Sequence, residues 1–376
     1  MTSQAPVVAL SEPVRVQVSQ IDKQLNQIFQ SQADGGATRA STFNLLVYER
    51  EEQDANDIAE TIGAIAVQYP CRAIVISAAP QAPDAGLEAL VAAYCPISEG
   101  GSRETICCEY VTLRAKGQVL EELHTTVASL LMPDLQTFLW WRGPINVNMQ
   151  LFMKLLDLVD RTIVDSSLFA APENALQRMA SLTLNPQQQS TFGDLNWSRL
   201  TSWREETALA FDSEERRSCL MALDNVVIEY GETDGNPNPN QAYLYLGWLA
   251  SRLGWEPLSL HKKEGTRQII LRGNDQPIQA IIRAVQTSDN TQAGQIISIG
   301  LRSSEEGAPC SVAICSDDSP SCMRVQMSIG ETSTSQLSNL QTQSIEQLLS
   351  QELQTQDRDV IFEQSLQVIN KLLQQG

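Results

Sequence analysis

The stretch FNLLVYEREEQDANDIAETIGAIAVQYPCRAIVIS, residues 43–77, decides the fold of the N-terminal half. Apolar runs at residues 43–49 and 71–77 read as buried strands. Between them Ile58, Ile62 and Ile65 recur at helical spacing, and Pro70 ends the helix. Because two strands joined through a helix run parallel, this segment predicts a βαβ unit and an α/β domain.

The alternation of strands and helices continues toward residue 190. VAAYCPI and TICCEYVTLRA are joined through Gly100 and Gly101, which is typical of a hairpin. A helix at 120–131, the strand QTFLWWRG, a helix around NMQLFMKLLDLV and the strand RTIVDSS follow. We therefore predict an N-terminal extension with a helix over 1–40, then a mostly parallel, Rossmann-like α/β domain over 41–190.

The pattern changes in the second half of the chain. The segment QAYLYLGWLASRL is apolar nearly all round and stops at Gly254, as a buried central helix would. Six runs with strand alternation follow, separated by Gly, Asn, Asp and Pro, and they predict an antiparallel meander. From about Ser335 the tail is Gln-rich but helical in pattern. The expected fold is a C-terminal α+β domain over 191–376 with an antiparallel sheet and terminal helices.

Composition limits the classes of partner. The chain of 376 residues has 26 Lys and Arg against 45 Asp and Glu, a formal charge of −19, which repels nucleic-acid phosphates and anionic lipid headgroups. No leader sequence and no apolar segment of spanning length are visible. We therefore expect a cytoplasmic protein that binds neither nucleic acid nor membrane.

Signatures of catalysis and cofactor binding are missing. The sequence has no G-x-G-x-x-G after the first strand, no phosphate-binding P-loop and no G-x-S-x-G elbow, and it has only two histidines. We predict no catalytic residue, no cofactor and no metal site. Asp165, Ser166 and Ser167 end a predicted parallel strand, where α/β sheets bind ligands. The alternative is that these three residues cap the next helix.

The segment GDLNWSRLTSWREE, residues 193–206, holds the candidate interaction residues Trp197, Arg199, Trp203 and Arg204. Thr201 has N-cap chemistry, and Glu205 and Glu206 follow in the first turn or just after it, so a helix is expected to begin here. One interpretation packs both indoles into the junction between the two halves. The other makes the cluster a partner-binding face, because Trp and Arg are enriched at interface hot spots.

Two sets of cysteines are candidates for redox chemistry. Cys315 and Cys322 flank SDDSPS, and if that segment is a hairpin turn the two residues sit opposite each other. The second choice is Cys95 with Cys107 or Cys108 on the first hairpin. The alternative is that these residues are small hydrophobes within strands, as cysteines in a reduced protein often are.

The quoted motifs resemble a known family. PCRAIVI, FLWWRGP, VDSS, DLNWSRLTSWRE and YLYLGWLASRLGW are similar to the OpcA family, the glucose-6-phosphate dehydrogenase assembly proteins of cyanobacteria and actinobacteria. The resemblance runs from about residue 10 to the C-terminus, and Ser202 departs from it where the family usually has proline.

The resemblance implies a function in regulation. It implies a non-catalytic partner that binds oligomeric glucose-6-phosphate dehydrogenase and favours its active assembly in the oxidative pentose phosphate pathway. It also implies control by thioredoxin, without saying which cysteines respond. The alternatives are a passive scaffold, or an enzyme that uses Asp165 and Arg142 at the carboxyl ends of the N-terminal sheet.

Overall fold

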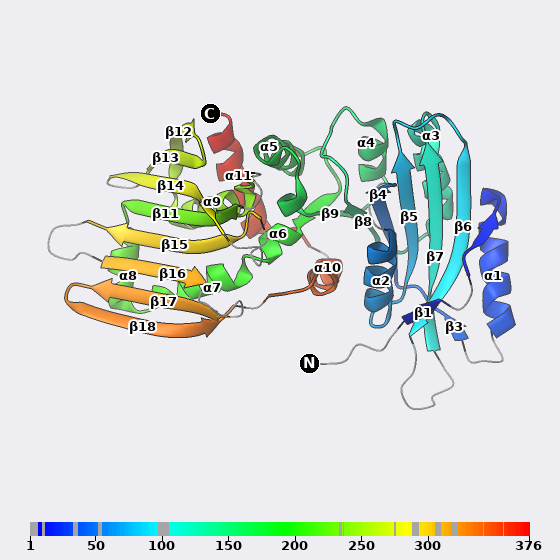
Figure 1. The fold of residues 1–376 in the computed structure, drawn as a ribbon, viewed down its shortest axis with the longest axis horizontal. Coiled ribbons are helices and arrows are strands. Elements are labelled where there is room, and N and C mark those ends of the chain that lie inside the picture. The colour runs from blue at the N-terminus through cyan, green and yellow to red at the C-terminus, as the bar shows by residue number, and fades with distance from the viewer. Residues whose placement is uncertain are drawn as a thin grey trace. The chain divides into compact units, whose positions relative to one another are not determined.

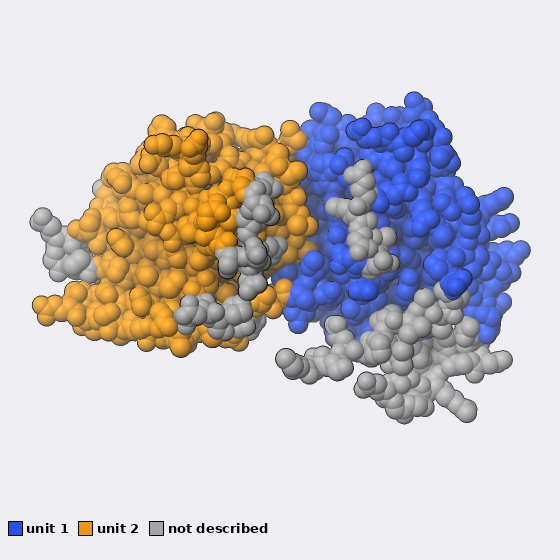
Figure 2. All heavy atoms as spheres, in the orientation of Figure 1, with its two compact units in different colours: residues 1–164, 186–193, 344–357 blue, residues 165–185, 194–343, 358–376 orange. Residues whose placement is uncertain are grey.

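The computed structural model describes residues 7–9, 12–32, 37–51, 55–96, 105–232, 235, 237–273, 276–287, 293–304, 310–316, 322–340, 342–355 and 357–376. The chain forms two compact units, each made of separate segments (Figure 2). Unit 1 comprises residues 1–164, 186–193 and 344–357. Unit 2 comprises residues 165–185, 194–343 and 358–376.

Unit 1 is built on a ten-stranded sheet with the order β1-β6-β7-β5-β4-β8-β9-β10 (Figure 1). The two further strands, β2 and β3, pair with β6 and β7. Strands β7, β5, β4, β8 and β9 run parallel, and β6 is antiparallel to β7. The strands are β1 Val7–Ala9, β2 Val14–Val16, β3 Ala37–Arg39, β4 Phe43–Arg50, β5 Cys71–Ala79, β6 Leu87–Pro96, β7 Thr105–Lys116, β8 Thr137–Trp141, β9 Arg161–Val164 and β10 Thr191–Asp194.

The helices of unit 1 pack their apolar faces on this sheet and on one another. They are α1 Ile21–Gln32, α2 Ala55–Ala66, α3 Val119–Leu130, α4 Gln150–Leu156 and α10 Ile345–Gln354, with the short 3₁₀ turn η1 Val18–Gln20. The predicted βαβ unit is β4, α2 and β5, and its two strands are parallel. Arg161 and Glu352 form a buried ion pair at 2.6 Å, which holds α10 against the start of β9.

Unit 2 contains an eight-stranded sheet with the order β12-β13-β14-β11-β15-β16-β17-β18. The strands are β11 Asn225–Glu232, β12 Glu256–Lys263, β13 Thr266–Arg272, β14 Pro277–Gln286, β15 Ile296–Ser303, β16 Cys310–Ser316, β17 Cys322–Ile329 and β18 Thr332–Asn339. The predicted uninterrupted meander is wrong at one place, because β11 lies between β14 and β15 and pairs parallel with β14. The start of the Gln-rich tail also belongs to a strand, β18, rather than to a helix.

One face of the unit 2 sheet is covered by helices, drawn with the strands in Figure 1. The helical segments are η3 Ser166–Leu168, α5 Pro172–Thr183, α6 Leu195–Ser198, α7 Thr201–Ala210, α8 Glu214–Met221, α9 Asn240–Leu253 and α11 Val360–Leu373. Helix α9 is buried along nearly its whole length and ends at Gly254, whose φ of +68° is the left-handed conformation that glycine adopts without strain.

The predicted fold class is confirmed. The N-terminal sheet is mostly parallel and flanked by helices, and the C-terminal sheet is mostly antiparallel with terminal helices. None of the helices that the structure describes is both long enough and apolar enough to cross a membrane.

Candidate partner-binding site

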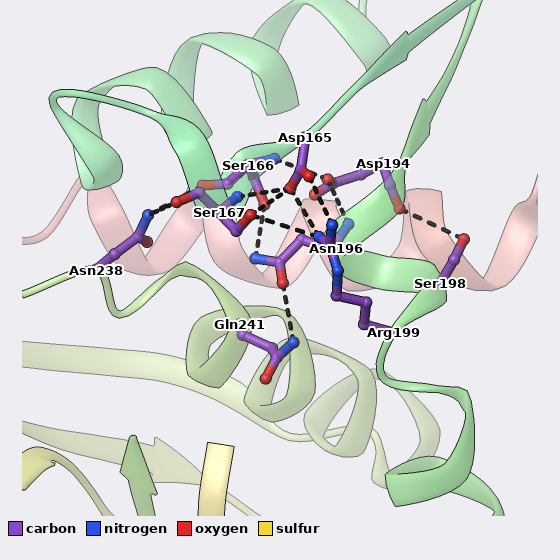
Figure 3. Close-up of polar contacts among 9 residues, drawn as sticks. All are labelled: Asp165, Ser166, Ser167, Asp194, Asn196, Ser198, Arg199, Asn238 and Gln241. Atoms are coloured by element: carbon purple, nitrogen blue, oxygen red, sulfur yellow. Dashed lines mark hydrogen bonds and ion pairs between the residues drawn. The ribbon is translucent and has the colours of Figure 1, made fainter. Parts of the chain in front are cut away.

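The motifs VDSS and DLNWSR meet in one polar network (Figure 3). Asp165 directly follows β9, and Asp194 ends β10, the next strand of the same sheet. The two acidic side chains therefore come together at neighbouring strand ends, although 29 positions separate them in the sequence. Every residue of the network discussed below belongs to unit 2.

Asp165 is held by Arg199. Arg199 Nη1 donates to Asp165 Oδ1 and Nη2 donates to Oδ2, both at 2.8 Å, which is the bidentate geometry that suits a guanidinium and a carboxylate. Burial opposes the charge on Arg199, but its bonds to Asp165 outweigh this and raise its pKa. Asp165 Oδ1 also accepts the backbone N–H of Ser167 at 3.1 Å, so it caps the turn η3. The capping alternative is therefore confirmed for Asp165, whereas Ser166 and Ser167 lie within the turn η3 itself.

Asp194 is the buried carboxyl group of the network. Its Oδ1 accepts the backbone N–H groups of Ser166 at 2.9 Å and Asn196 at 3.0 Å. Burial, and after it the neighbouring Asp165, raise the pKa of Asp194 to about 7, although the bonds from Ser166 and Asn196 partly offset both effects. Asp194 therefore exchanges its proton near neutral pH, and it caps helix α6.

Amide side chains complete the network. Asn196 Nδ2 donates to Ser166 Oγ at 3.0 Å, and Gln241 Nε2 donates to Asn196 Oδ1 at 2.9 Å. Asn238 Nδ2 donates to the carbonyl of Ser167 at 2.7 Å. Four members of the network were not predicted from the sequence: Asp194, Asn196, Asn238 and Gln241. Asp194 had the signal of an N-cap before a short helical stretch, but the amides have no pattern that reveals a partner so far along the chain.

Trp197 and Arg204 pack against each other beside helix α11. The Trp197 indole is 3% exposed, and its Nε1 donates to Asp359 Oδ2 at 2.9 Å. The Arg204 guanidinium carbon lies 3.7 Å from the centre of the Trp197 ring, a cation–π contact. Burial lowers the pKa of Arg204 to about 10, against the opposing effect of Asp359 and Glu205, so the side chain stays charged at neutral pH.

Trp203 lies in the core of unit 2 on helix α7, with 1% of its surface exposed. The helix begins at Thr201 after the N-cap residue Leu200, one residue earlier than predicted, and Thr201 Oγ1 donates to the carbonyl of Ser198. All four candidate residues therefore belong to unit 2, and both indoles are buried there. Whether the cluster reaches a partner or joins the two halves stays a prediction.

A small cavity of about 70 Å³ adjoins the network. Its lining includes Ser167, Asn196, Arg199, Trp203 and Gln241, and Arg199 is the one ionisable side chain among the lining residues that the structure describes. Cavities that bind drug-sized ligands measure about 300–1,000 Å³. A larger hollow of about 410 Å³ beside the end of α8 has no ionisable side chain in its described lining.

The two polar groups of the enzyme alternative are both engaged by partners of their own unit. Arg142, in unit 1, donates to Asp57 at 3.2 Å and lies over the ring of Trp140 at 5.1 Å. Asp165, in unit 2, is held by Arg199 as described above. Neither is a free group aimed at a substrate-sized cavity.

The predicted register of Cys315 and Cys322 is wrong. Arg324 lies opposite Cys315, and the partner of Cys322 is Asn339 on the next strand. Pairing between β16 and β17 continues one residue beyond Cys315, to Ser316 and Met323. Cys315 and Cys322 are therefore diagonal neighbours on one face of the sheet rather than a directly facing pair. Both thiols are reduced and half-buried, and Cys315 Sγ donates to the carbonyl oxygen of Arg324 at 3.8 Å. The turn between them lies outside the described residues.

Five of the other cysteines fall into two groups, and the sixth, Cys71 on β5, is a free buried thiol. Cys219 of α8 and Cys310 of β16 form a disulfide with a Cα–Cα distance of 6.1 Å. In the first hairpin Tyr94 pairs with Cys108, and Cys107 is disulfide-bonded. Cys108 is free, and burial raises the pKa of its thiol to about 12. The side chain of Cys95 lies outside the described residues.

Both halves of the chain match models of known protein families. Residues 63–181 match the family model of the glucose-6-phosphate dehydrogenase subunit N-terminal domain, and residues 190–366 match that of the C-terminal domain. The chain belongs to the OpcA family. The sequence resemblance is thereby confirmed, and all residues of the network described above fall within the two matched ranges.

Relatives within the OpcA family support the assignment. The OxPP cycle protein OpcA of Nostoc punctiforme is 33% identical over 96% of this chain and 94% of its own length. That of Synechococcus elongatus is 31% identical over 100% and 99%. That of Synechocystis sp. is 37% identical over 85% of this chain, which spans 66% of the relative's length.

Among solved structures, a glucose-6-phosphate 1-dehydrogenase from Mycobacterium avium aligns with a TM-score of 0.49 at 11% identity, over 88% of this chain and 91% of that chain. An oxidoreductase from Sinorhizobium meliloti aligns with a TM-score of 0.49 at 10% identity, over 89% and 97%. At these identities the likeness says nothing about activity.

Proposed function

We propose that the protein is a non-catalytic, cytoplasmic activator that binds glucose-6-phosphate dehydrogenase and favours its active oligomer, promoting the oxidative pentose phosphate pathway. The observation that carries the proposal is the match of both halves to the two domains of a glucose-6-phosphate dehydrogenase subunit family. The site agrees with it, because Asp165 and Arg199 neutralise each other and the adjoining cavity is too small for a sugar phosphate with a nucleotide.

An activator of this kind works by differential binding. It must bind the active state of the dehydrogenase more tightly than the inactive state. The free energy by which it shifts the dehydrogenase toward the active state cannot exceed that difference in binding free energy. A coupling of about 1–3 kcal/mol changes the affinity for substrate about 5- to 150-fold.

The test is dehydrogenase kinetics at low glucose 6-phosphate with and without this protein. We expect a lower KM for glucose 6-phosphate and a shift to the larger oligomer in analytical ultracentrifugation, with no turnover by the purified protein alone. Binding with unchanged kinetics would favour a passive scaffold. Turnover of a sugar phosphate by the protein alone would favour the enzyme alternative, which the engaged Asp165 and Arg142 count against.

We further propose that thioredoxin controls the activation through a reversible disulfide. Cys315 with Cys322 remains the pair we propose, and Cys95 with Cys107 or Cys108 remains the second choice. Diagonal neighbours lie about 7–8 Å apart and disulfides need Cβ atoms about 4 Å apart, so closure of the first pair requires local movement of the strands.

Differential alkylation and mass spectrometry of oxidised and thioredoxin-reduced protein test the redox proposal. Activation of the dehydrogenase by the variants Cys315→Ser and Cys322→Ser should then no longer depend on thioredoxin. Full alkylation of both residues under oxidising conditions would exclude this pair. The same experiment measures the alkylation of Cys219 and Cys310, whose disulfide serves as an internal reference for reduction.

A further inference from the structure

One face of the unit 2 sheet has no described helix of that unit on it. Along each central strand buried residues alternate with residues that are half-buried or exposed, as Val226, Ile228 and Tyr230 alternate with Val227 and Glu229. The buried set faces the helices, since Cys310 of that set is bonded to α8. We call the other side the open sheet face. It includes the cross-strand row Gln268–Ile281–Val227–Gly300–Ala313–Gln326.

The middle of the open sheet face is apolar. Ile281, Val227, Gly300 and Ala313 are neighbours on four consecutive strands of the sheet, and all four are only partly buried. A solvated sheet face ordinarily carries polar residues. A run of small and branched apolar residues at its centre, with polar residues around it, is the arrangement of an interface core and its rim.

The rim of the open sheet face is basic, although the chain as a whole carries a charge of −19. The register puts two acidic side chains on this face, Glu229 and Glu256, each paired with an arginine. It puts five basic side chains there: Lys263, Arg272, Arg283, Arg302 and Arg324. Among the strand residues that the structure describes, this face thus carries three more basic than acidic side chains.

Size and charge together indicate the occupant. Eight strands about 4.8 Å apart and three rows of outward residues cover on the order of 700 Å², close to the ~800 Å² that each partner contributes to a stable interface. A second copy packed face to face would oppose two positive surfaces, which costs binding energy. A different protein that carries an acidic rim around an apolar patch complements both the apolar centre and the basic rim of the open sheet face.

We propose that the open sheet face is the surface on which this protein docks an acidic patch of its dehydrogenase partner. The proposal rests on the proposed function for the identity of that partner. Cys315 and Cys322 lie on the same face, in register with Arg324 and two residues before it. A redox change at either thiol would therefore act directly on the docking surface.

Charge reversal tests the rim. The double variant Arg302→Glu/Arg324→Glu should bind the dehydrogenase at least tenfold more weakly, mainly through slower association, and the loss should shrink at high salt. The matched control is Arg178→Glu/Arg217→Glu, which makes the same change of charge on α5 and α8, helices of the covered side. Its affinity should stay within twofold of the wild type. Thermal melting of each variant verifies that the fold is kept.

The unmodified protein provides a second measurement. Maleimide labelling of Cys315 and Cys322 should slow at least fivefold when the dehydrogenase is bound, while the buried thiols Cys71 and Cys108 stay unreactive with or without it. Failure of the wild type to bind the dehydrogenase would overturn the proposed function and this inference together. Normal binding by Arg302→Glu/Arg324→Glu with unprotected thiols would overturn the inference alone. If Arg302→Glu/Arg324→Glu lost self-association and kept its binding to the dehydrogenase, the inference would be overturned, and the occupant of the open sheet face would be a second copy of this chain.

Discussion

Trp203 is the residue on which the two sequence interpretations differ most. Its indole is 1% exposed on helix α7, so the side chain belongs to the core of unit 2. Trp203→Ala should lower the free energy of unfolding by about 3–5 kcal/mol, the usual cost of removing a buried large aromatic side chain. Urea denaturation measures this directly. An unchanged midpoint together with weaker binding of the dehydrogenase would make Trp203 a surface hot spot instead.

Asp194 gives the stability of the protein a distinct dependence on pH. Its pKa of about 7 in the folded chain lies above the ordinary value of 3.8. The native state therefore holds the proton more tightly, and the stabilising contribution is complete below about pH 4 and is lost as the pH rises to about 7. Each unit of pKa difference corresponds to about 1.4 kcal/mol.

The variant Asp194→Asn removes this titration and keeps an acceptor oxygen for Ser166 and Asn196. Between pH 4.5 and pH 8 the unfolding free energy of the wild type should fall relative to that of the variant. Parallel stability curves across that range would show that the Asp194 pKa is not raised.

At the scale of elements, the Cys219–Cys310 disulfide ties helix α8 to strand β16 across a sequence separation of 91 residues. Closing a loop of this length stabilises a fold by about 2–4 kcal/mol. Cys219→Ala/Cys310→Ala should therefore melt at a lower temperature than the oxidised wild type. The reduced wild type is the control and should melt near the variant. Equal melting of the variant and the oxidised wild type would contradict the prediction.

The sequence predicted most elements because their buried residues recur at the strand or helix period. The run at residues 43–49 and the helix ending at Gly254 are examples, and the structure places β4 and α9 there. Strand β18 was missed since TSTSQLSN has neither an apolar face nor a turn signal inside it. Its pairing with β17 is made by backbone hydrogen bonds, which leave no mark on side-chain pattern.

Pairings between distant segments could not be predicted from the sequence, for a different reason. Nothing local shows that β11 enters the sheet beside β14 and β15, because its alternation fits any central position. The same holds for Cys219 with Cys310 and for Gln241 with Asn196. The site was therefore predictable in part: Asp165 and Arg199 could be picked out as candidates, while the network that joins them needed the fold.

At the scale of the whole molecule, the chain passes between its two units several times. Residues 165–185 belong to unit 2 although they precede the predicted boundary at 190, and residues 344–357 belong to unit 1 although they follow it. Helix α5 packs on α11 within unit 2, with Leu176 and Met179 buried. A cut near residue 190 therefore removes part of the unit 2 core.

This connectivity predicts how fragments behave. Residues 191–376 alone should show no cooperative thermal transition, because they lack α5 and with it the buried contacts of Leu176 and Met179 and the Asp165 partner of Arg199. Residues 165–376 contain every segment of unit 2 and should melt cooperatively, with the segment 344–357 left without its unit 1 partners. Circular dichroism melts of the two fragments at equal concentration make the comparison. A cooperative transition of 191–376 at the same temperature as 165–376 would show that α5 is dispensable and that the boundary predicted from the sequence is a true domain boundary.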